Sequence, residues 1–169
     1  MNIELPDAEL AYQALLIQIQ SALPGAGSLL VGVHSGGAWI ASRLCADLNE
    51  TATVPVRLGF LSSAFHRDDY GQRGLPGEMK ATDLPLSIDG TDIILVDDIL
   101  YTGRTVRAVL NELFDYGRPR SVQLAVLVDR GGRELPIEAN FVGAIFAPET
   151  GQKLQLQQDE SGAFTLAIN

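Results

Sequence analysis

Positive charge, cysteine and long apolar runs are all scarce in this sequence. Its 12 lysine and arginine residues face 21 acidic residues, which gives a net charge of -9 over 169 residues. That excess of negative charge argues against the sequence-independent binding of phosphate backbones that nucleic-acid-binding proteins need. The single cysteine, Cys45, excludes an internal disulfide and fits a reducing compartment.

Membrane and export signals are also missing. No apolar run approaches the roughly 20 residues that a membrane helix needs. The first ten residues, MNIELPDAEL, are acidic and lack the basic and apolar regions of a signal peptide. We therefore expect a cytoplasmic protein with no membrane segment.

The apolar pattern predicts a single domain over residues 1–169. Short apolar runs are typical of strands buried on both faces, and apolar residues at helical spacing lie between them. In the first predicted helix, Leu10, Ala14 and Ile17 share one face. The predicted elements are helices at about 7–22, 39–48 and 106–114, strands at 29–33, 54–60, 93–96, 121–129 and 141–146, and a C-terminal β-hairpin at about 154–168.

The alternation of strands and helices predicts an α/β fold. The economical arrangement is a mostly parallel twisted sheet flanked by helices, with the hairpin added at the end. Ligands in such folds bind at the carboxyl ends of the strands. Three unusual turns fall there, at residues 34–37, 97–105 and 129–136. Residues 62–90 show no regular pattern, which is typical of a mobile lid, a binding loop or a disordered segment.

The strongest chemical motif is IILVDDILYTGRT, residues 93–105. Asp97 and Asp98 follow a buried strand and suit a ribose diol or a hydrated Mg²⁺. The turn Thr102-Gly103-Arg104-Thr105 opens a helix, whose N–H groups form a donor site for phosphate. The alternative is that the two acids only complement a helix dipole. That alternative does not account for the Thr-Gly-Arg-Thr turn that follows them.

This motif resembles the phosphoribosyl pyrophosphate signature of type I phosphoribosyltransferases. Residues 31–41, VGVHSGGAWIA, are similar to the pyrophosphate-binding loop of that family, and residues 65–74, FHRDDYGQRG, to its lid. Residues 97–119 and 122–137 are most similar to the subfamily of bifunctional pyrimidine-operon regulators that are also uracil phosphoribosyltransferases. In that subfamily, residues 129–136 correspond to a hood over the base.

The resemblance implies a site, a metal and partners. It implies a Mg²⁺-dependent enzyme that makes UMP from uracil and phosphoribosyl pyrophosphate, as a homodimer. Arg67 either reaches the diphosphate or pairs with Asp68 or Asp69, and Arg130 and Arg133 either face the ligand or pair with Glu134. The implied catalytic residues are Asp97, Asp98 and Arg67, with Mg²⁺ held at Asp97 and Asp98 through substrate and water. The implied substrate-binding residues are His34, Ser35, Gly36, Gly37, Tyr101, Thr102, Gly103, Arg104, Thr105, Asp129 and Arg130.

The sequence also departs from the family at several positions. Tyr101 stands where purine enzymes carry an Asp, which disfavours hypoxanthine and guanine. Gly36 stands where the subfamily often has a basic residue, so pyrophosphate contact relies on backbone there. The first helix has no basic residue, and Gly132 replaces a hood histidine, which disfavours RNA binding. The alternatives are an RNA-binding regulator that senses UMP, or a catalytically weak nucleotide-sensing subunit.

Overall fold

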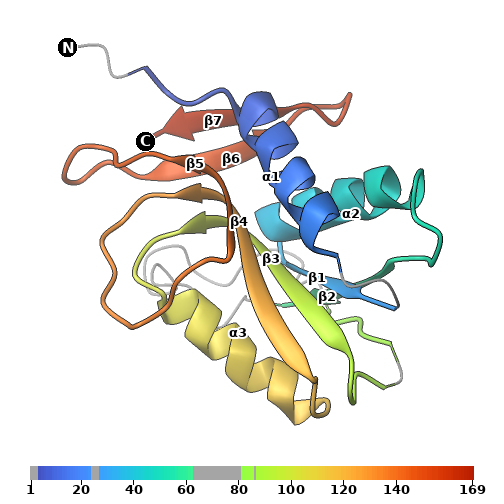
Figure 1. Cartoon of the computed structure of the whole chain (residues 1–169). Helices are drawn as coiled ribbons and strands as arrows, with labels where there is room; N and C mark the ends of the chain where they lie inside the picture. The colour runs from blue at the N-terminus through green and yellow to red at the C-terminus, as the bar shows by residue number, and fades with distance from the viewer. Residues whose placement is uncertain (1–3, 24–26, 63–80, 86) are drawn as a thin grey trace.

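The computed structural model describes residues 4–23, 27–62, 81–85 and 87–169. A five-stranded sheet lies between helices, and a two-stranded hairpin packs at one end (Figure 1). No helix in this part of the chain is long and apolar enough to cross a membrane. The elements are α1 (Ala8–Ala22), β1 (Leu29–Val33), α2 (Gly36–Asn49), β2 (Arg57–Leu61), β3 (Asp92–Leu100), α3 (Arg104–Asp115), β4 (Ser121–Asp129), β5 (Phe141–Ile145), β6 (Leu154–Gln158) and β7 (Phe164–Ile168).

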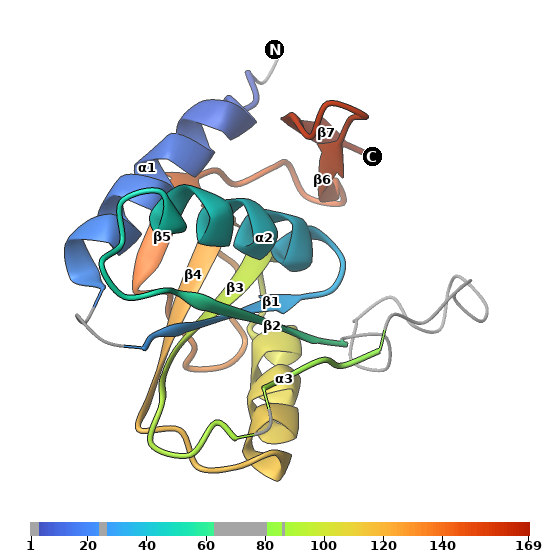
Figure 2. The same ribbon diagram turned by 90° about the vertical axis from the view of Figure 1, so that its right-hand side faces the viewer.

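All strands of the larger sheet run parallel, in the order β2-β1-β3-β4-β5. Figure 2 shows α1 and α2 on one face of this sheet and α3 on the other. β6 and β7 form a separate antiparallel hairpin. The predicted fold class is therefore confirmed. β1, β3 and β4 are neighbouring parallel strands. The three turns singled out in the sequence therefore begin side by side, at the carboxyl ends of these strands.

The central strands send alternate side chains into two separate apolar cores. On β1, Leu30 belongs to the core beneath α1 and α2, whereas Leu29 belongs to the core beneath α3. On β3, Ile94 and Ile93 divide in the same way. Burial on both faces explains why these strands are unbroken apolar runs in the sequence.

The edge strand β5 is covered by α1. The Gln18 side-chain amide donates to the Val142 carbonyl at 2.8 Å, and its oxygen accepts from the Val142 N–H at 3.2 Å. The helix lies so close that a Cβ at Gly143 would be 2.5 Å from the Ala11 carbonyl oxygen. Gln18 thus occupies both polar groups of Val142, which protects this edge from pairing with another strand.

Several predicted details differ from the structure. Leu10 and Ile17 are 70% and 61% exposed, and α1 instead buries Ala8, Ala11, Tyr12, Leu15, Leu16 and Ile19. β2 begins at Arg57, not at residue 54, because Pro55 lacks an N–H and Val54 is exposed. The predicted lid falls partly outside the described residues, at 63–80 and 86. Within its described part, Asp83 exchanges two backbone hydrogen bonds with Phe60, and Ile88 is buried.

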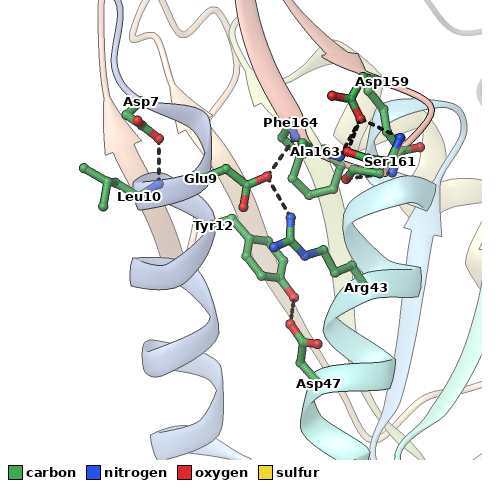
Figure 3. Close-up of polar contacts among 12 residues, drawn as sticks. Asp7, Glu9, Leu10, Tyr12, Arg43, Asp47, Asp159, Ser161, Ala163 and Phe164 are labelled. Carbon is green, nitrogen blue, oxygen red and sulfur yellow. Dashed lines mark hydrogen bonds and ion pairs between the residues drawn. The ribbon is translucent and has the colours of Figure 1, made fainter.

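Glu9 joins α1 to α2 and to the C-terminal hairpin. Its Oε1 accepts from the Arg43 guanidinium at 2.8 Å and from the Phe164 N–H at 2.8 Å (Figure 3). The Arg43 guanidinium also lies over the Tyr12 ring, 4.2 Å from its centroid, and the Tyr12 hydroxyl donates to Asp47 at 2.5 Å. This cluster fixes the hairpin against the two helices.

The Glu9 contacts predict a small, pH-dependent contribution to stability. The Arg43 hydrogen bond outweighs burial and, with the Phe164 N–H, holds the pKa of Glu9 below its usual value. Because the pKa is lower in the folded state, the stabilisation is present above the unfolded pKa of about 4.3 and is lost as pH falls through the folded value. Glu9→Gln should lower the free energy of unfolding by about 0.5–1 kcal/mol at neutral pH, since the pair is partly exposed.

Urea unfolding at neutral pH and near pH 3.5 measures this difference, which should shrink at the lower pH. Glu160→Gln is the control, because Glu160 is exposed on the same hairpin and makes none of these contacts. An equal loss for Glu9→Gln at both pH values would show that the charge of Glu9 contributes nothing.

Candidate active site

Asp97 and Asp98 lie within β3, near its carboxyl end. The strand continues past the predicted end at residue 96 because Asp97 and Ile99 pair with β4. Successive strand residues point to opposite faces, so one acid lies on each side of the sheet. Asp97 is buried, and its Oδ1 accepts from the Asp98 N–H at 2.9 Å; Asp98 is half-buried, and its Oδ1 accepts from the Ile99 N–H at 2.8 Å.

α2 begins directly against these acids. Only His34 and Ser35 separate β1 from α2, and the peptide bond between them is cis. A Cβ at Gly36 would lie 2.3 Å from Oδ2 of Asp98, and a Cβ at Gly37 would lie 2.3 Å from the Val96 carbonyl oxygen. Gly37 therefore allows the amino end of α2 to contact the backbone at the end of β3, whereas a side chain at Gly36 would displace the Asp98 carboxyl.

The predicted phosphate turn opens α3. Gly103 has φ +89°, a conformation that side chains disfavour, and α3 starts at the next residue. The Arg104 N–H donates to Thr102 Oγ1 at 3.2 Å. The N–H groups of Thr105 and Val106 belong to the first turn of α3 and so have no acceptor within the helix. The helix dipole adds partial positive charge at this point, which suits an anion.

The hood, residues 129–136, is joined to the phosphate turn by backbone contacts. The Thr102 carbonyl accepts from the N–H groups of Glu134 and Leu135, at 3.0 and 3.2 Å. The Arg130 N–H donates to the Leu100 carbonyl at 3.0 Å. A Cβ at Gly103 would lie 3.0 Å from the Ile137 Cβ. The two segments are about 30 residues apart in sequence but form one structural unit.

The charged side chains of the hood are mostly engaged by protein groups. Arg104 Nε donates to Glu134 at 2.7 Å. Arg133 pairs with Asp129 and donates to the Tyr101 carbonyl at 2.9 Å. Burial alone would raise the pKa of Asp129, but the Arg133 hydrogen bond and the Gly131 N–H together lower it. Asp129 is thus held as a carboxylate that orders the hood.

The structure brings together most of the predicted site residues. The carboxyl ends of the strands carry residues 34–37, the acids of β3, the turn 102–105 and the hood. Arg67 lies outside the described residues. Of the two alternatives for Arg130 and Arg133, pairing with Glu134 is not found: Arg104 pairs with Glu134, Arg133 pairs with Asp129, and Arg130 lies over the Tyr101 ring. Sequence reasoning also missed Ile137, whose contact with Gly103 has no local signal.

Comparison with known proteins fits this arrangement. Residues 4–153 match the family model described as "Phosphoribosyl transferase domain", so the fold and the site define a phosphoribosyltransferase-type protein. A relative from Ralstonia nicotianae, named "Bifunctional protein PyrR", is 48% identical over 166 residues, covering 96% of this chain and 92% of the relative. Another of the same name, from Nitrosococcus oceani, is 54% identical over 114 residues, covering 68% and 63%. This chain therefore belongs to the type I phosphoribosyltransferase family, within its group of bifunctional PyrR proteins.

Solved structures share the fold at lower identity. A hypoxanthine phosphoribosyltransferase from Staphylococcus aureus has a TM-score of 0.64 at 26% identity, covering 88% of this chain and 79% of that chain. A hypoxanthine-guanine phosphoribosyltransferase from Bacillus anthracis has a TM-score of 0.66 at 22% identity, covering 90% and 87%. The second likeness concerns the fold alone.

The contact between Gly36 and Asp98 predicts a steric effect on ligand binding. Gly36→Ala should displace the Asp98 carboxyl, because the added Cβ would overlap it. Losing one charged hydrogen bond costs roughly 1.5–3 kcal/mol, so binding of phosphoribosyl pyrophosphate should weaken about tenfold or more. Isothermal titration calorimetry measures this affinity.

A double-mutant cycle with Asp98→Ala isolates the contact. The effect of Gly36→Ala should shrink in that background, because two of the three overlapping atoms, Oδ2 and Cγ of Asp98, are gone. Alanine also favours a helix more than glycine does, so a loss of binding is not a helix-propensity effect. Fully additive effects of the two substitutions would contradict this steric explanation.

Proposed function

We propose that the protein is a uracil phosphoribosyltransferase, which forms UMP and pyrophosphate from uracil and phosphoribosyl pyrophosphate. One observation carries this proposal. Two helix amino ends, those of α2 and α3, flank the two acids of β3 at one edge of the sheet. Donors for two phosphate groups thus lie on either side of acceptors for sugar hydroxyls, as a ribose with a 5-phosphate and a 1-diphosphate requires.

Each part of the site has a distinct task in this proposal. The N–H groups of Thr105 and Val106 and the hydroxyls of Thr102 and Thr105 bind the 5-phosphate. The carboxylates of Asp97 and Asp98 bind the ribose diol and stabilise positive charge as the C1–O bond to diphosphate breaks. The amino end of α2, at Ser35-Gly36-Gly37, binds the departing diphosphate. The pyrimidine N1 then attacks C1 from the side opposite the diphosphate and releases its proton, which leaves UMP and pyrophosphate as products.

The donor set at β3 fits Mg²⁺ that is held largely by substrate and water. Two carboxylates are present, and the described residues contain no cluster of three or more side chains suited to a metal. Mg²⁺ favours oxygen ligands and usually keeps several waters, with phosphates completing its shell. When bound, it would neutralise charge on the diphosphate. Asp97 and Asp98 would orient its ligands.

The choice of uracil depends on Tyr101 and on the relatives. Tyr101 follows the two acids by three residues and lies between the phosphate turn and the hood. Its carbonyl is bound by Arg133 and its ring is covered by Arg130. This chain offers no carboxylate at that position to hold a purine. The related proteins called PyrR, of which this chain covers up to 92%, are described as bifunctional, which supports a catalytic role beside another role.

The base preference predicts a defined product spectrum. Purified protein incubated with phosphoribosyl pyrophosphate, Mg²⁺ and separate bases should convert uracil well above hypoxanthine or guanine. Chromatography of the nucleotide products measures each rate. Robust purine turnover without uracil turnover would contradict the proposed function and the role of Tyr101.

The control variants for this assay are Asp97→Asn and Asp98→Asn, which keep side-chain shape and remove charge. Each should fold and lose about 10- to 150-fold in turnover, since a charged hydrogen bond is worth roughly 1.5–3 kcal/mol. Normal turnover in both variants would exclude the proposed role of these acids at the ribose.

Regulatory RNA binding is a second candidate function, favoured by the word bifunctional in the relatives' name. The charge distribution of the described residues does not favour it. α1 carries no basic residue. Arg118 and Arg120 lie at the amino ends of the strands, opposite the candidate site, where Arg120 is paired with Asp92 and Arg118 binds the Phe114 carbonyl. These arginines are therefore largely engaged by protein groups.

We expect no high-affinity binding of this protein to its own pyrimidine-operon leader. RNA affinity rises with the number of phosphates that basic side chains neutralise, and non-specific affinities are about 10⁻⁴–10⁻⁶ M. Gel-shift titration at near-physiological salt, with and without UMP, is the measurement. Nanomolar, UMP-dependent binding would establish the regulatory function and show that a basic first helix is not needed.

A further inference from the structure

The peptide unit between Leu61 and Ser62, at the end of β2, is held on both sides. Its carbonyl oxygen, on Leu61, accepts from the His34 N–H at 3.0 Å. Its own N–H, on Ser62, donates to the Thr82 hydroxyl oxygen at 3.1 Å. His34 begins the turn that leads into α2, and its ring stacks on the Phe60 ring with the centroids 5.2 Å apart. The end of β2 is therefore attached to the turn that precedes α2.

Thr82 extends this connection to α3. Its hydroxyl donates to Glu112 Oε1 at 2.8 Å, so it accepts one hydrogen bond and donates another. A bond to a carboxylate is stronger than one between neutral groups, and successive hydrogen bonds polarise one another. Glu112 lies about two helical turns beyond Thr105, on the helix that begins at the phosphate turn. We call this series, from the His34 N–H through peptide 61–62 and the Thr82 hydroxyl to the Glu112 carboxylate, the Thr82 bridge.

Backbone contacts hold Thr82 in place without using its side chain. The next residue, Asp83, exchanges two backbone hydrogen bonds with Phe60, at 2.7 and 2.9 Å. A Cβ at Gly59 would lie 3.0 Å from Leu84 Cδ2 and 3.1 Å from the Asp83 carbonyl oxygen, so this segment lies directly against β2. Removal of the Thr82 hydroxyl should therefore break the Thr82 bridge and leave the segment on the sheet.

We propose that Thr82 is a positioning residue that sets the separation between the two phosphate sites. This inference rests on the proposed function, in which the amino end of α2 binds the diphosphate and the first turn of α3 binds the 5-phosphate. Apolar packing of α3 on the sheet has no preferred direction, whereas hydrogen bonds do. The Thr82 bridge joins the turn before α2 to α3 through such directional contacts. A ligand that occupies both sites at once requires their separation to be correct.

A matched pair of variants isolates the Thr82 hydroxyl. Thr82→Val keeps the branched shape and removes the hydroxyl, whereas Thr82→Ser keeps the hydroxyl. Three ligands then separate positioning from a general loss of structure. Ribose 5-phosphate occupies only the first turn of α3, pyrophosphate occupies only the amino end of α2, and phosphoribosyl pyrophosphate occupies both. Isothermal titration calorimetry with Mg²⁺ measures the three dissociation constants.

Thr82→Val should selectively weaken the ligand that occupies both sites. Its affinity for phosphoribosyl pyrophosphate should fall about three- to tenfold, because the gain from binding two linked groups depends on geometry. The affinities for ribose 5-phosphate and for pyrophosphate should each change less than about twofold, because each ligand uses one site. Thr82→Ser should bind all three ligands as the wild type does. Equal losses for the three ligands, no loss for phosphoribosyl pyrophosphate, or a serine variant as weak as the valine variant would overturn the positioning role.

A double-mutant cycle tests the link to α3. The effect of Thr82→Val on phosphoribosyl pyrophosphate affinity should shrink in a Glu112→Ala background, because the hydroxyl then has no carboxylate to reach on α3. The cycle subtracts the other effects of removing Glu112, which are the same with either residue at position 82. Fully additive effects would show that the hydroxyl acts on β2 alone and would overturn the connection to α3.

Hydrogen exchange measured by NMR tests the Thr82 bridge without any ligand. The Ser62 amide should exchange on the order of tenfold faster in Thr82→Val than in Thr82→Ser, because its acceptor is lost. Equal exchange in the two variants would overturn the Thr82 bridge. If Thr82→Val fails to fold, Thr82→Ala removes the same hydroxyl and takes its place in each comparison. If the wild-type protein binds no phosphoribosyl pyrophosphate, the proposed function and the positioning role fail together, whereas the exchange rates still decide whether Thr82 holds the end of β2.

Discussion

The candidate site depends on the close contact between the amino end of α2 and the carboxyl end of β3. Gly36 and Gly37 have no side chains, so the helix meets the strand where Asp98 and the Val96 carbonyl lie. A larger residue at Gly37 would press on the Val96 carbonyl and separate α2 from β3, whereas a side chain at Gly36 would displace the Asp98 carboxyl. The parallel order of the sheet adds β4 and the hood beside them.

The hood is an extension of the phosphate turn. The carbonyls of Leu100 and Thr102 accept three backbone hydrogen bonds from residues 130–135, and Arg104 pairs with Glu134. Because α3 begins within the same unit, any movement of the hood is coupled to the first turn of that helix. On the proposed function, a site built in this way would bind phosphate and base through one connected segment.

The sequence predicted the fold well because its strongest signals are local. Strands that are buried on both faces are continuous apolar runs in the sequence, and the Asp-Asp and Thr-Gly-x-Thr pattern identifies one turn. The details that the sequence predicted wrongly arise where two faces of one helix compete for burial, or where the contacting residues lie far apart in the sequence. α1 has a second apolar stripe, Leu10 and Ile17, that is exposed because the stripe containing Tyr12 packs on the sheet. The pairs Arg104–Glu134 and Gly103–Ile137 join residues about 30 positions apart, and no periodicity encodes such contacts.

An acidic protein that binds a polyphosphate must confine its positive potential to a small volume. Among the described residues near the site, Arg104 and Arg133 are ion-paired within the protein. On the proposed function, the donors are mainly N–H groups at two helix starts, whose dipoles are fixed and do not titrate. Such donors fit a compact ligand with phosphates at two set positions. An RNA backbone extends its phosphates over a longer surface, which only spaced lysine and arginine side chains could follow. The arrangement that suits a sugar phosphate therefore disfavours a nucleic acid.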